Sequence, residues 1–413
     1  MRKSDGYSAA FPTTDISTIR LRMRLALKDS ILLTGATGAL GSMLLQRLCH
    51  QGYDVICLVR AQDRSEARAR IRALVGDHHE HVRVIRGDVT EPHCGISDLD
   101  REVLVSQVRR VLHCAASINF QDKNETELTN VAGTLHVLEL TDILDASHIL
   151  HISTAYVIGD ASYLSERDLS LGQRWNNSYE ESKYIGERMV HAWALKREEC
   201  RFTIFRPSVL IGCEDGTTST FDGYYRYLEP IHRVAQSLRA RRGNLLPPDV
   251  RVADDGLVSV PLAVLVADKR VNYVPIDWVA DMIVAAVEAP GRNETYHLVH
   301  HDPVRLRDAL SWSLNHLKIK GITVCDTQEE KENAVKTQTP LVRRLQRQID
   351  FVHDAYLPYC TKEPQFQMEA ARRNLGRKFR LPPVVDRQFL ERTLSSAQDS
   401  NWGSTKQRLY ATA

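Results

Sequence analysis

The sequence predicts an α/β fold built on a doubly wound parallel sheet, with a smaller, mainly helical part at the C-terminal end. Between residues 30 and 207, short apolar segments typical of buried strands alternate with longer segments of helical periodicity. A glycine-rich turn joins the first predicted strand to the first predicted helix. Right-handed crossovers bring the carboxyl ends of such strands to one edge of the sheet, so ligand-binding residues are expected there.

The predicted elements follow one another in strand–helix order. Strands are expected at residues 31–33, 54–59, 82–87, 109–113, 148–152 and 202–206. Helices are expected at residues 40–49, 64–75 and 124–145, and from Tyr179 onward. Beyond Pro207 the alternation loosens, and Val274-Pro-Ile-Asp277 is expected to open a further helix with Asp277 as its N-cap.

The bulk composition indicates a globular protein whose main partner is not a nucleic acid. The chain has 413 residues, of which 43% are hydrophobic and 26% charged, and its formal net charge is +2. Its eight cysteines form no CxxC pair and have no histidine at zinc-finger spacing, so free thiols and no metal site are expected. No apolar run reaches the about 20 residues that span a bilayer. We therefore expect a soluble, cytoplasmic protein.

The N-terminal residues 1–28 are predicted to be a loose leader. Within them, residues 19–28 alternate basic and apolar side chains. An edge strand or surface segment is the interpretation that we favour. The alternative is a basic contact with an acidic carrier protein or with the surface of an anionic membrane.

The turn after the first strand, Thr34-Gly-Ala-Thr-Gly-Ala-Leu-Gly41, predicts a dinucleotide site of the Rossmann type. Such a site needs a tight turn, close approach of the backbone to a pyrophosphate, and a helix N-terminus facing the negative charge. The GxxGxxG pattern and its position between a strand and a helix meet these needs. The residues expected to contact the cofactor here are Gly35, Thr37, Gly38, Ala39, Leu40 and Gly41.

The ends of later strands complete the predicted cofactor site. Arg60 ends the second strand, where an NAD site usually has an acidic residue, and a guanidinium suits the 2′-phosphate of NADPH. An exposed basic helix face is the favoured interpretation of Arg64, Arg68, Arg70 and Arg72. Asp88 could meet the adenine amino group or could be a turn residue. Further expected contacts are Val89, Ala115, Ala116, Tyr179, Lys183, Pro207, Ser208 and Val209.

A candidate catalytic site follows the fifth strand. Tyr179 and Lys183 form a YxxxK pair, which places both side chains on one face of a helix. A charged lysine beside a phenol lowers the pKa of the phenol, so that it can exchange a proton. Thr154 would donate a hydrogen bond to the substrate oxygen, and Ser153 is the competing candidate. Asn130 could hold a water that relays protons to Lys183, or it could be a locally bonded helix residue.

Together these motifs resemble the extended short-chain dehydrogenases/reductases. The nearest resemblance is to the fatty acyl-CoA reductase and thioester reductase branch, which includes the male sterility reductases and the reductase domains of carboxylic acid reductases and peptide synthetases. The stretches that carry it are Leu32–Gly41, Leu58-Val-Arg60, His113-Cys-Ala-Ala-Ser-Ile-Asn-Phe120, Asn130-Val-Ala-Gly-Thr134, Ser153-Thr-Ala-Tyr-Val157, Tyr179–Glu187, Arg206-Pro-Ser-Val209 and Val274–Val279. The resemblance covers roughly residues 29–290.

The resemblance implies a function and a set of roles. Thr154, Tyr179 and Lys183 would form the active site, supported by Asn130, and the family's spacing selects Thr154 over Ser153. The implied reaction is NADPH-dependent reduction of an acyl thioester to an aldehyde, with reduction to the alcohol left open. An acyl-CoA or acyl carrier protein would supply the thioester in trans. Arg239, Arg241 and Arg242 could meet its phosphates, or they could form a solvated helix face.

Two other functions are compatible with the same scaffold. One is a dehydrogenase or epimerase acting on a sterol or a nucleotide sugar, and the other is a non-catalytic NADP-binding regulator. The presence of both Tyr179 and Lys183 disfavours the regulator. The domain boundaries that follow from the patterns are a leader at residues 1–28, the NADP-binding Rossmann domain at 29–212, a substrate-side insertion mixed with returning Rossmann elements at 213–304, and a helical C-terminal region at 305–413.

Overall fold

The six strands predicted between residues 31 and 206 form one sheet together with β14, a later strand that was not predicted. The seven strands lie in the order β14-β7-β5-β4-β1-β2-β3, and every neighbouring pair is parallel. The structure is a computed structural model that describes residues 30–75, 80–105, 107–241, 246–289 and 293–403. The leader and the basic and apolar segment expected at residues 19–28 lie outside these ranges. The strands of the sheet are β1 (Ser30–Thr34), β2 (Val55–Val59), β3 (Val82–Arg86), β4 (Val108–His113), β5 (His148–Ile152), β7 (Arg201–Pro207) and β14 (Glu294–Leu298).

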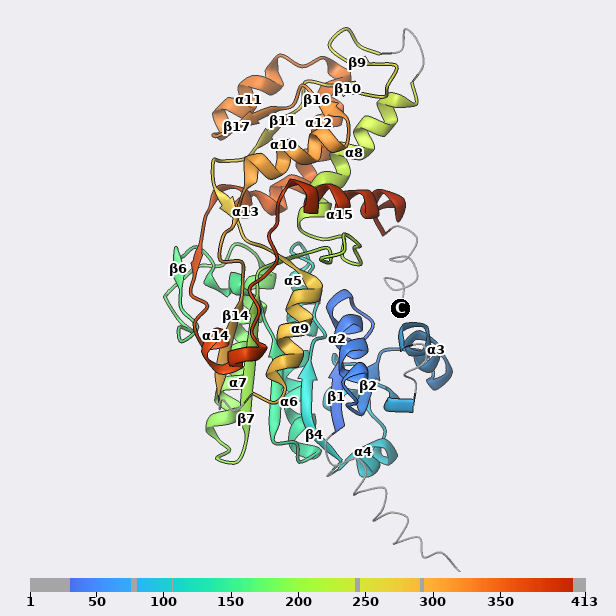
Figure 1. Ribbon diagram of the computed structural model, residues 1–413, viewed down its shortest axis with the longest axis vertical. Helices are drawn as coiled ribbons and strands as arrows, with labels where there is room; N and C mark the ends of the chain where they lie inside the picture. Colours follow the sequence, from blue (N-terminus) through green and yellow to red (C-terminus); the bar gives the residue numbers. More distant parts are fainter. Residues whose placement is uncertain (1–29, 76–79, 106, 242–245, 290–292, 404–413) are drawn as a thin grey trace, which may run out of the picture.

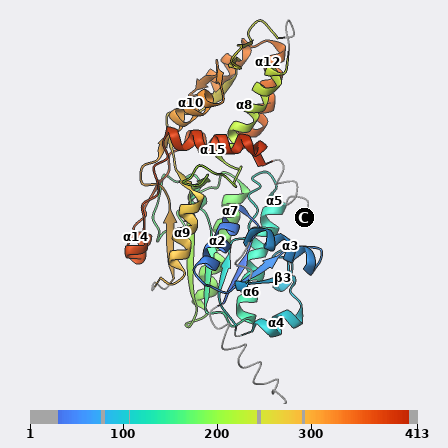
Figure 2. The same ribbon diagram turned by 45° about the vertical axis from the view of Figure 1, so that its right-hand side comes forward.

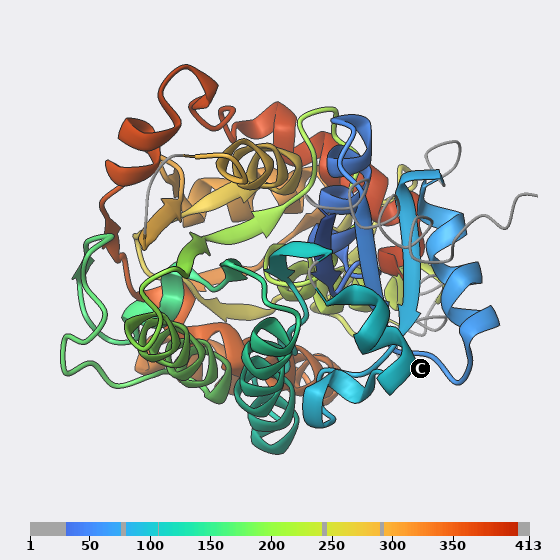
Figure 3. The same cartoon turned by 90° about the horizontal axis from the view of Figure 1, so that it is seen from below.

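Helices cover both faces of this sheet, so the predicted doubly wound Rossmann architecture is confirmed (Figure 1). One face carries α2 (Ala39–His50), α3 (Arg64–Val75), α9 (Ile276–Ala286) and α14 (Ala370–Leu375). The other carries α4 (Asp98–Leu104), α6 (Gly133–Ile143) and α7 (Ser178–Leu195). A view from below shows the two helical layers on opposite sides of the strands (Figure 3). Burial of alternate strand side chains against the two layers is the main stabilising force.

A second, smaller lobe stands above the carboxyl edge of the sheet, in the upper half of Figure 1. Its helices are α8 (Tyr224–Arg239), α10 (Leu306–His316), α11 (Gln328–Lys336), α12 (Pro340–His353), α13 (Leu357–Thr361) and α15 (Arg387–Asp399). Its strands are β9 (Arg251–Val252), β10 (Val258–Ser259), β11 (Ala263–Leu265), β16 (Ile319–Lys320) and β17 (Thr323–Cys325). This lobe has its own apolar core, in which α8, α10, α12 and α15 pack together.

The chain crosses between the two parts repeatedly. Three short strand pairs lie at the junction: β8 (Val209–Ile211) with β13 (Tyr273–Pro275), β12 (Arg270–Val271) with β15 (Val304–Arg305), and β6 (Tyr163–Leu164) with β18 (Gln365–Phe366). After the small lobe, α14 returns to pack beside β14, and α15 then lies across the base of the small lobe (Figure 2). Short helices complete the chain: α5 (Lys123–Thr126), η2 (Pro92–Gly95), η3 (Glu127–Ala132), η4 (Ala155–Ile158), η6 (Asp354–Tyr356), η7 (Gly376–Lys378) and η8 (Asn401–Gly403).

Two local predictions need correction. Asp277 is not the N-cap of α9, because Pro275 occupies that position and Asp277 lies in the first turn. Its carboxylate accepts from the backbone N–H of Glu214 and of Trp278, each at 3.0 Å, so it ties the helix start to the loop after β8. The helix expected at 124–145 is also interrupted, since residues 127–132 form a π-helical turn. Such turns are frequent at functional sites.

Candidate functional site

A cavity of about 380 Å³ lies where the carboxyl edge of the sheet meets the small lobe. Twelve of the residues predicted for the site line it: Gly35, Gly38, Ala39, Leu40, Gly41, Ala116, Thr154, Tyr179, Lys183, Pro207, Ser208 and Val209. The other predicted residues, Thr37, Arg60, Asp88, Val89, Ala115 and Asn130, do not line this cavity. The structure therefore brings the glycine turn and the YxxxK pair to one space, as the strand order requires.

The glycine turn is held by close backbone contacts that exclude larger residues. Gly35 has a φ of +72°, and a Cβ there would lie 2.6 Å from the backbone nitrogen of Ala115. A Cβ on Gly41 would lie 2.0 Å from the carbonyl oxygen of Gly35. Gly38, the N-cap of α2, offers no side-chain acceptor to the helix N-terminus. The free N–H groups at this end of α2 therefore suit the pyrophosphate of a dinucleotide.

A buried hydrogen-bond chain fixes the position of this turn. The Thr34 hydroxyl oxygen accepts from the backbone N–H of Cys114 and of Ala115, each at 3.2 Å, so its own proton goes to Nδ1 of His113 at 2.9 Å. Nε2 of His113 then carries the proton and donates to the Thr134 hydroxyl at 3.2 Å. This tautomer is neutral, and burial lowers the pKa of His113 to about 3. Sequence reasoning assigned no role to His113.

Thr154, Tyr179 and Lys183 converge from two elements. Thr154 caps η4, and its hydroxyl accepts from the backbone N–H of Tyr156 at 3.2 Å. Tyr179 and Lys183 project from the first turns of α7, whose N-cap is Asn177. The Tyr179 phenol makes a side-chain hydrogen bond with Thr154. Ser153 also lines the cavity, so Thr154 is distinguished from it by this bond to Tyr179.

Burial is the largest influence on the pKa values of Tyr179 and Lys183. Burial raises the pKa of Tyr179 to about 12, and the hydrogen bond with Thr154 only partly opposes this rise. Burial also lowers the pKa of Lys183 to about 8, with Cys114 and Glu187 acting in the other direction. Lys183 is not among the causes of the Tyr179 shift, and the expected lowering of the Tyr179 pKa by Lys183 stays a prediction.

Asn130 lies in the π-helical turn and is 1% exposed. Its amide nitrogen donates to the carbonyl oxygen of Ser117 and to the hydroxyl of Ser182, each at 2.9 Å. Its amide oxygen accepts from the backbone N–H of Ser117 at 2.8 Å. Ser182 precedes Lys183, so Asn130 braces the turn of α7 that carries Lys183. Its proposed role in a water relay stays a prediction.

Arg70, which was expected to lie on an exposed helix face, instead contacts the glycine turn. The Arg70 guanidinium donates to the carbonyl oxygen of Arg60 and to the hydroxyl of Thr37, the latter at 3.3 Å. Arg60 itself has an exposed side chain. The contact spans 33 residues of sequence, so no local pattern distinguished Arg70 from its neighbours.

Asp88, Val89 and Arg239 have structural partners. One carboxylate oxygen of Asp88 accepts from both the backbone N–H and the hydroxyl of Thr90 at 2.9 Å, which is the turn arrangement that the sequence left open. The carbonyl oxygen of Val89 contacts Nδ1 of His136 at 2.9 Å. The Arg239 guanidinium donates to the carbonyl oxygens of Gly256, Leu317 and Lys318, so it braces the small lobe instead of facing a ligand. Arg241 is exposed, and Arg242 lies outside the described residues.

The small lobe is tied to α7, the helix that carries Tyr179 and Lys183. The Tyr359 hydroxyl donates to the buried Glu180 carboxylate at 2.6 Å and accepts from the Asn177 side chain at 2.8 Å. Lys362 donates to the side chain of Asn176 at 2.8 Å. Because Glu180 follows Tyr179 directly, α13 is fixed against the turn that carries the phenol.

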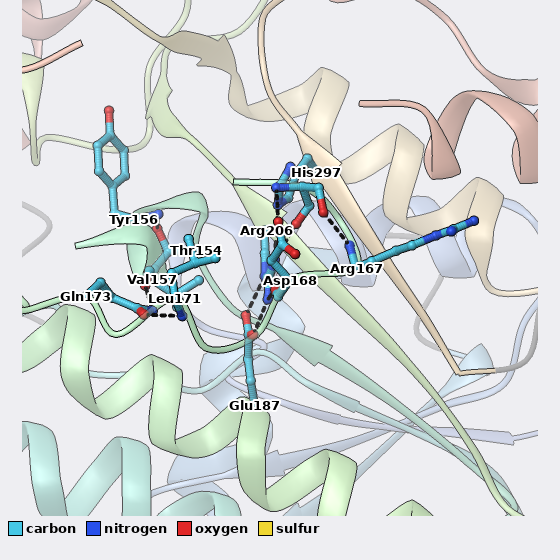
Figure 4. A network of polar contacts seen from close by, with 11 residues as sticks. Thr154, Tyr156, Val157, Arg167, Asp168, Leu171, Gln173, Glu187, Arg206 and His297 are labelled. Atoms are coloured by element: carbon cyan, nitrogen blue, oxygen red, sulfur yellow. Dashed lines mark hydrogen bonds and ion pairs between the residues drawn. The ribbon is translucent and has the colours of Figure 1, made fainter. Parts of the chain in front are cut away.

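A second network anchors the loop that follows Thr154 (Figure 4). Arg206 and Glu187 form a bidentate pair with N–O distances of 2.9 and 2.7 Å, and their side chains are 1% and 0% exposed. Arg206 also donates to the carbonyl oxygens of Ser165 and Asp168 and contacts Nε2 of His297 at 3.2 Å. Each of the three nitrogens of this buried guanidinium therefore has at least one acceptor. A charge in the interior of a protein needs such partners.

Comparison with known proteins agrees with this geometry. The sequence profile of the family described as "Male sterility protein" matches residues 33–283, which is more than half of the chain. The chain belongs to the male sterility protein family. The resemblance to the male sterility reductases that was inferred from the motifs is thereby confirmed.

The chain is similar to longer proteins over part of their length. It is 29% identical over 224 residues to a nonribosomal peptide synthetase of Aspergillus flavus, covering 48% of this chain and 22% of that protein. It is 24% identical over 317 residues to a fatty acyl-CoA reductase of Drosophila melanogaster, covering 66% and 56%. The chain thus spans about half or less of the length of these relatives.

The fold is shared with a solved reductase domain. The crystal structure of the terminal R domain from the myxalamid PKS-NRPS biosynthetic pathway superposes with a TM-score of 0.71, at 22% identity, over 94% of this chain and 99% of that one. Within the described ranges of the chain, none of the helices has the length and apolar character needed to cross a membrane. The same ranges contain no cluster of three or more His, Cys, Asp or Glu side chains arranged to hold a metal ion.

Proposed function

We propose that the protein reduces an acyl thioester to an aldehyde with NADPH. The observation that carries this proposal is the convergence of Thr154, Tyr179 and Lys183 on the same cavity as the glycine turn, with an apolar chamber continuing into the small lobe. A site for a hydride donor, a pair of hydroxyl donors and a chamber for an acyl chain are the parts that thioester reduction needs. The names of the peptide synthetase and acyl-CoA reductase relatives support the same class of substrate.

The residues of the chain would act on the substrate carbonyl as follows. NADPH, when bound, supplies the hydride that adds to the carbonyl carbon. The hydroxyls of Thr154 and Tyr179 donate hydrogen bonds to the carbonyl oxygen as it gains negative charge. Since the pKa of Tyr179 is about 12, the phenol is protonated at neutral pH and is ready to give its proton to that oxygen. Collapse of the thiohemiacetal then releases the aldehyde and the thiol, and a second hydride transfer would give the alcohol.

Lys183 has a separate part in this proposal. Its pKa of about 8 leaves most of the amine protonated at neutral pH. A cation on the same face of α7 stabilises the phenolate that forms when Tyr179 gives up its proton. Lys183 would also hold the nicotinamide ribose, with Pro207, Ser208 and Val209 beside the nicotinamide.

The preference for NADPH is proposed to rest on two arginines. Arg60 stands at the end of β2, and Arg70 reaches back to it and to Thr37 of the glycine turn. Two guanidinium groups beside the ribose suit a 2′-phosphate better than a 2′-hydroxyl. Arg60 is the residue predicted from the sequence, and Arg70 is added by the structure.

Coenzyme A or an acyl carrier protein is proposed to deliver the thioester. We also propose a cytoplasmic location, supported by the eight free cysteines. The proposal keeps the division of the chain into a leader at residues 1–28, a Rossmann domain at 29–212, a substrate-side insertion at 213–304 and a helical C-terminal region at 305–413.

The test is NADPH consumption with a panel of acyl-CoA and carrier-protein thioesters, with NADH in parallel. Mass spectrometry of the products would distinguish the aldehyde from the alcohol. Consumption of NADPH with formation of either product is the expected result. Cofactor binding without turnover of any thioester would reject the proposal.

A further inference from the structure

The part of the cavity next to Tyr179 is walled by aromatic rings. The Phe120 ring lies 5.7 Å from the Tyr179 ring, 5.6 Å from Tyr356 and 5.8 Å from Tyr359, measured between ring centroids. Tyr156 meets Tyr359 edge to face at 4.9 Å. All five rings line the cavity. An acyl group bound in front of Tyr179 would therefore contact flat aromatic surfaces on several sides.

These walls are fixed in place. The Tyr359 hydroxyl is bonded to Glu180 at 2.6 Å and to Asn177 at 2.8 Å, so the ring cannot turn away without losing both bonds. Further along the cavity, Tyr224 is bonded to Ser313 at 2.7 Å and meets Tyr273 edge to face at 5.4 Å. Edge-to-face pairs add about 0.5–1.5 kcal/mol each beyond the burial of their area. A ligand must therefore fit the existing shape.

That shape limits the length of the acyl group. The volume of about 380 Å³ is near the lower end of the about 300–1,000 Å³ that ligand pockets span. The nicotinamide end of the cofactor would share this space, because the glycine turn lines the same cavity. Leu228, Leu306 and Leu310 line the small-lobe end. A short, flat group suits the remaining space better than a long saturated chain.

Tyr227, one of the wall residues, has a buried hydroxyl without a strong hydrogen-bond partner in the described part of the chain. The hydroxyl oxygen of Tyr227 is buried and, among the described residues, has no hydrogen-bond partner better than the thiol of Cys360. A thiol is a weak donor and a weak acceptor. The Tyr227 ring is held from behind by stacking on His353 at 3.7 Å. Because a buried hydroxyl without a good partner costs about 1–3 kcal/mol, a ligand that supplies the partner gains affinity.

We infer that the acyl group of the substrate is short and ends in an aromatic ring that carries a hydrogen-bonding substituent, such as a phenolic hydroxyl. The inference rests on the proposed thioester reduction. The aromatic walls select the ring, and Tyr227 selects its polar substituent. A long saturated acyl chain is disfavoured by the volume of the cavity and by its aromatic walls.

The test is calorimetric binding to the full chain in the presence of oxidised cofactor, which prevents turnover. The probes are the N-acetylcysteamine thioesters of dihydrocinnamic acid, of its para-hydroxy derivative and of lauric acid. The para-hydroxy thioester is expected to bind up to about tenfold more tightly than the unsubstituted aryl thioester, the equivalent of one hydrogen bond. The lauroyl thioester is expected to bind the weakest of the three.

Two variants isolate the role of Tyr227. In Tyr227→Phe, the advantage of the para-hydroxy probe should disappear while the unsubstituted aryl probe binds as before. Tyr163→Phe, on an exposed tyrosine outside the cavity, should leave all three affinities unchanged. Lauroyl binding as tight as aryl binding, no binding of either aryl probe, or a para-hydroxy advantage that survives in Tyr227→Phe would overturn the inference. Turnover of the same probes with NADPH tests the proposed function separately, because it does not depend on which probe binds best.

Discussion

Replacement of Glu187 by glutamine should destabilise the protein more than any matched change at its surface. The Glu187 carboxylate makes two charge-assisted hydrogen bonds to Arg206 at 2.9 and 2.7 Å, and both side chains are almost fully buried. The amide of glutamine keeps one acceptor but turns a donor toward a guanidinium that only donates. Breaking a buried pair on one side leaves an uncompensated charge, which costs about 3–5 kcal/mol.

The assay is urea denaturation followed by circular dichroism, with Glu391→Gln as the control. Glu391 pairs with Arg387 one turn apart on α15, and the arginine side chain is 59% exposed. A surface pair of this kind contributes about 0–1 kcal/mol, so the control should shift the midpoint only slightly. If Glu187→Gln and Glu391→Gln lower the midpoint equally, the buried pair does not stabilise the loop after Thr154, and the reasoning fails.

Three further predictions concern the site. Tyr179→Phe should lower turnover by about 10²–10⁴-fold with NADPH binding nearly unchanged, measured by steady-state kinetics and fluorescence titration; normal turnover would remove the proposed acid. Arg60→Ala and Arg70→Ala should each weaken the binding of NADPH about ten- to hundredfold and leave the binding of NADH unchanged. The control Arg68→Ala should change neither affinity. Equal effects on both cofactors would refute the 2′-phosphate contact. Lys183→Met should stabilise the cofactor-free protein by about 3 kcal/mol below pH 8, because burial lowers the pKa of the lysine from 10.5 to about 8. The wild-type folded state loses its buried proton above pH 8 while the unfolded state keeps it, so the advantage of Lys183→Met should shrink between pH 8 and 10.5, and denaturation midpoints that show a constant advantage would contradict the shift.

The elements that the sequence predicted well are those with local causes. The glycine turn between β1 and α2 needs a positive φ at Gly35 and no Cβ at Gly41, and both demands can be read from three glycines at fixed spacing. The strands around it are apolar because helices cover both of their faces. Their ends were predicted to within a residue or two, and the parallel order then placed Thr154 and Tyr179 at one edge.

The features that the sequence left hidden depend on contacts between distant residues. Arg70 is one of several similar arginines on α3, and only its contact with Thr37 sets it apart. Tyr359 and Glu180 are 179 residues apart in the sequence, so no pattern near either residue predicts the hydrogen bond between them. The contact of Asp277 was also hidden, because its carboxylate accepts a hydrogen bond from the backbone of Glu214, 63 residues earlier in the chain.

The repeated crossing of the chain between the sheet and the small lobe restricts how the molecule can be divided. A cut after β8 would separate the cofactor turn from α9 and β14, which the sheet needs. A cut before α14 would remove Glu369 and Ala370. The backbone N–H groups of these two residues donate to the Glu166 carboxylate. Exchange of the acyl chamber between relatives would therefore require several simultaneous junctions, and a library built with one crossover point should yield mostly insoluble chimaeras.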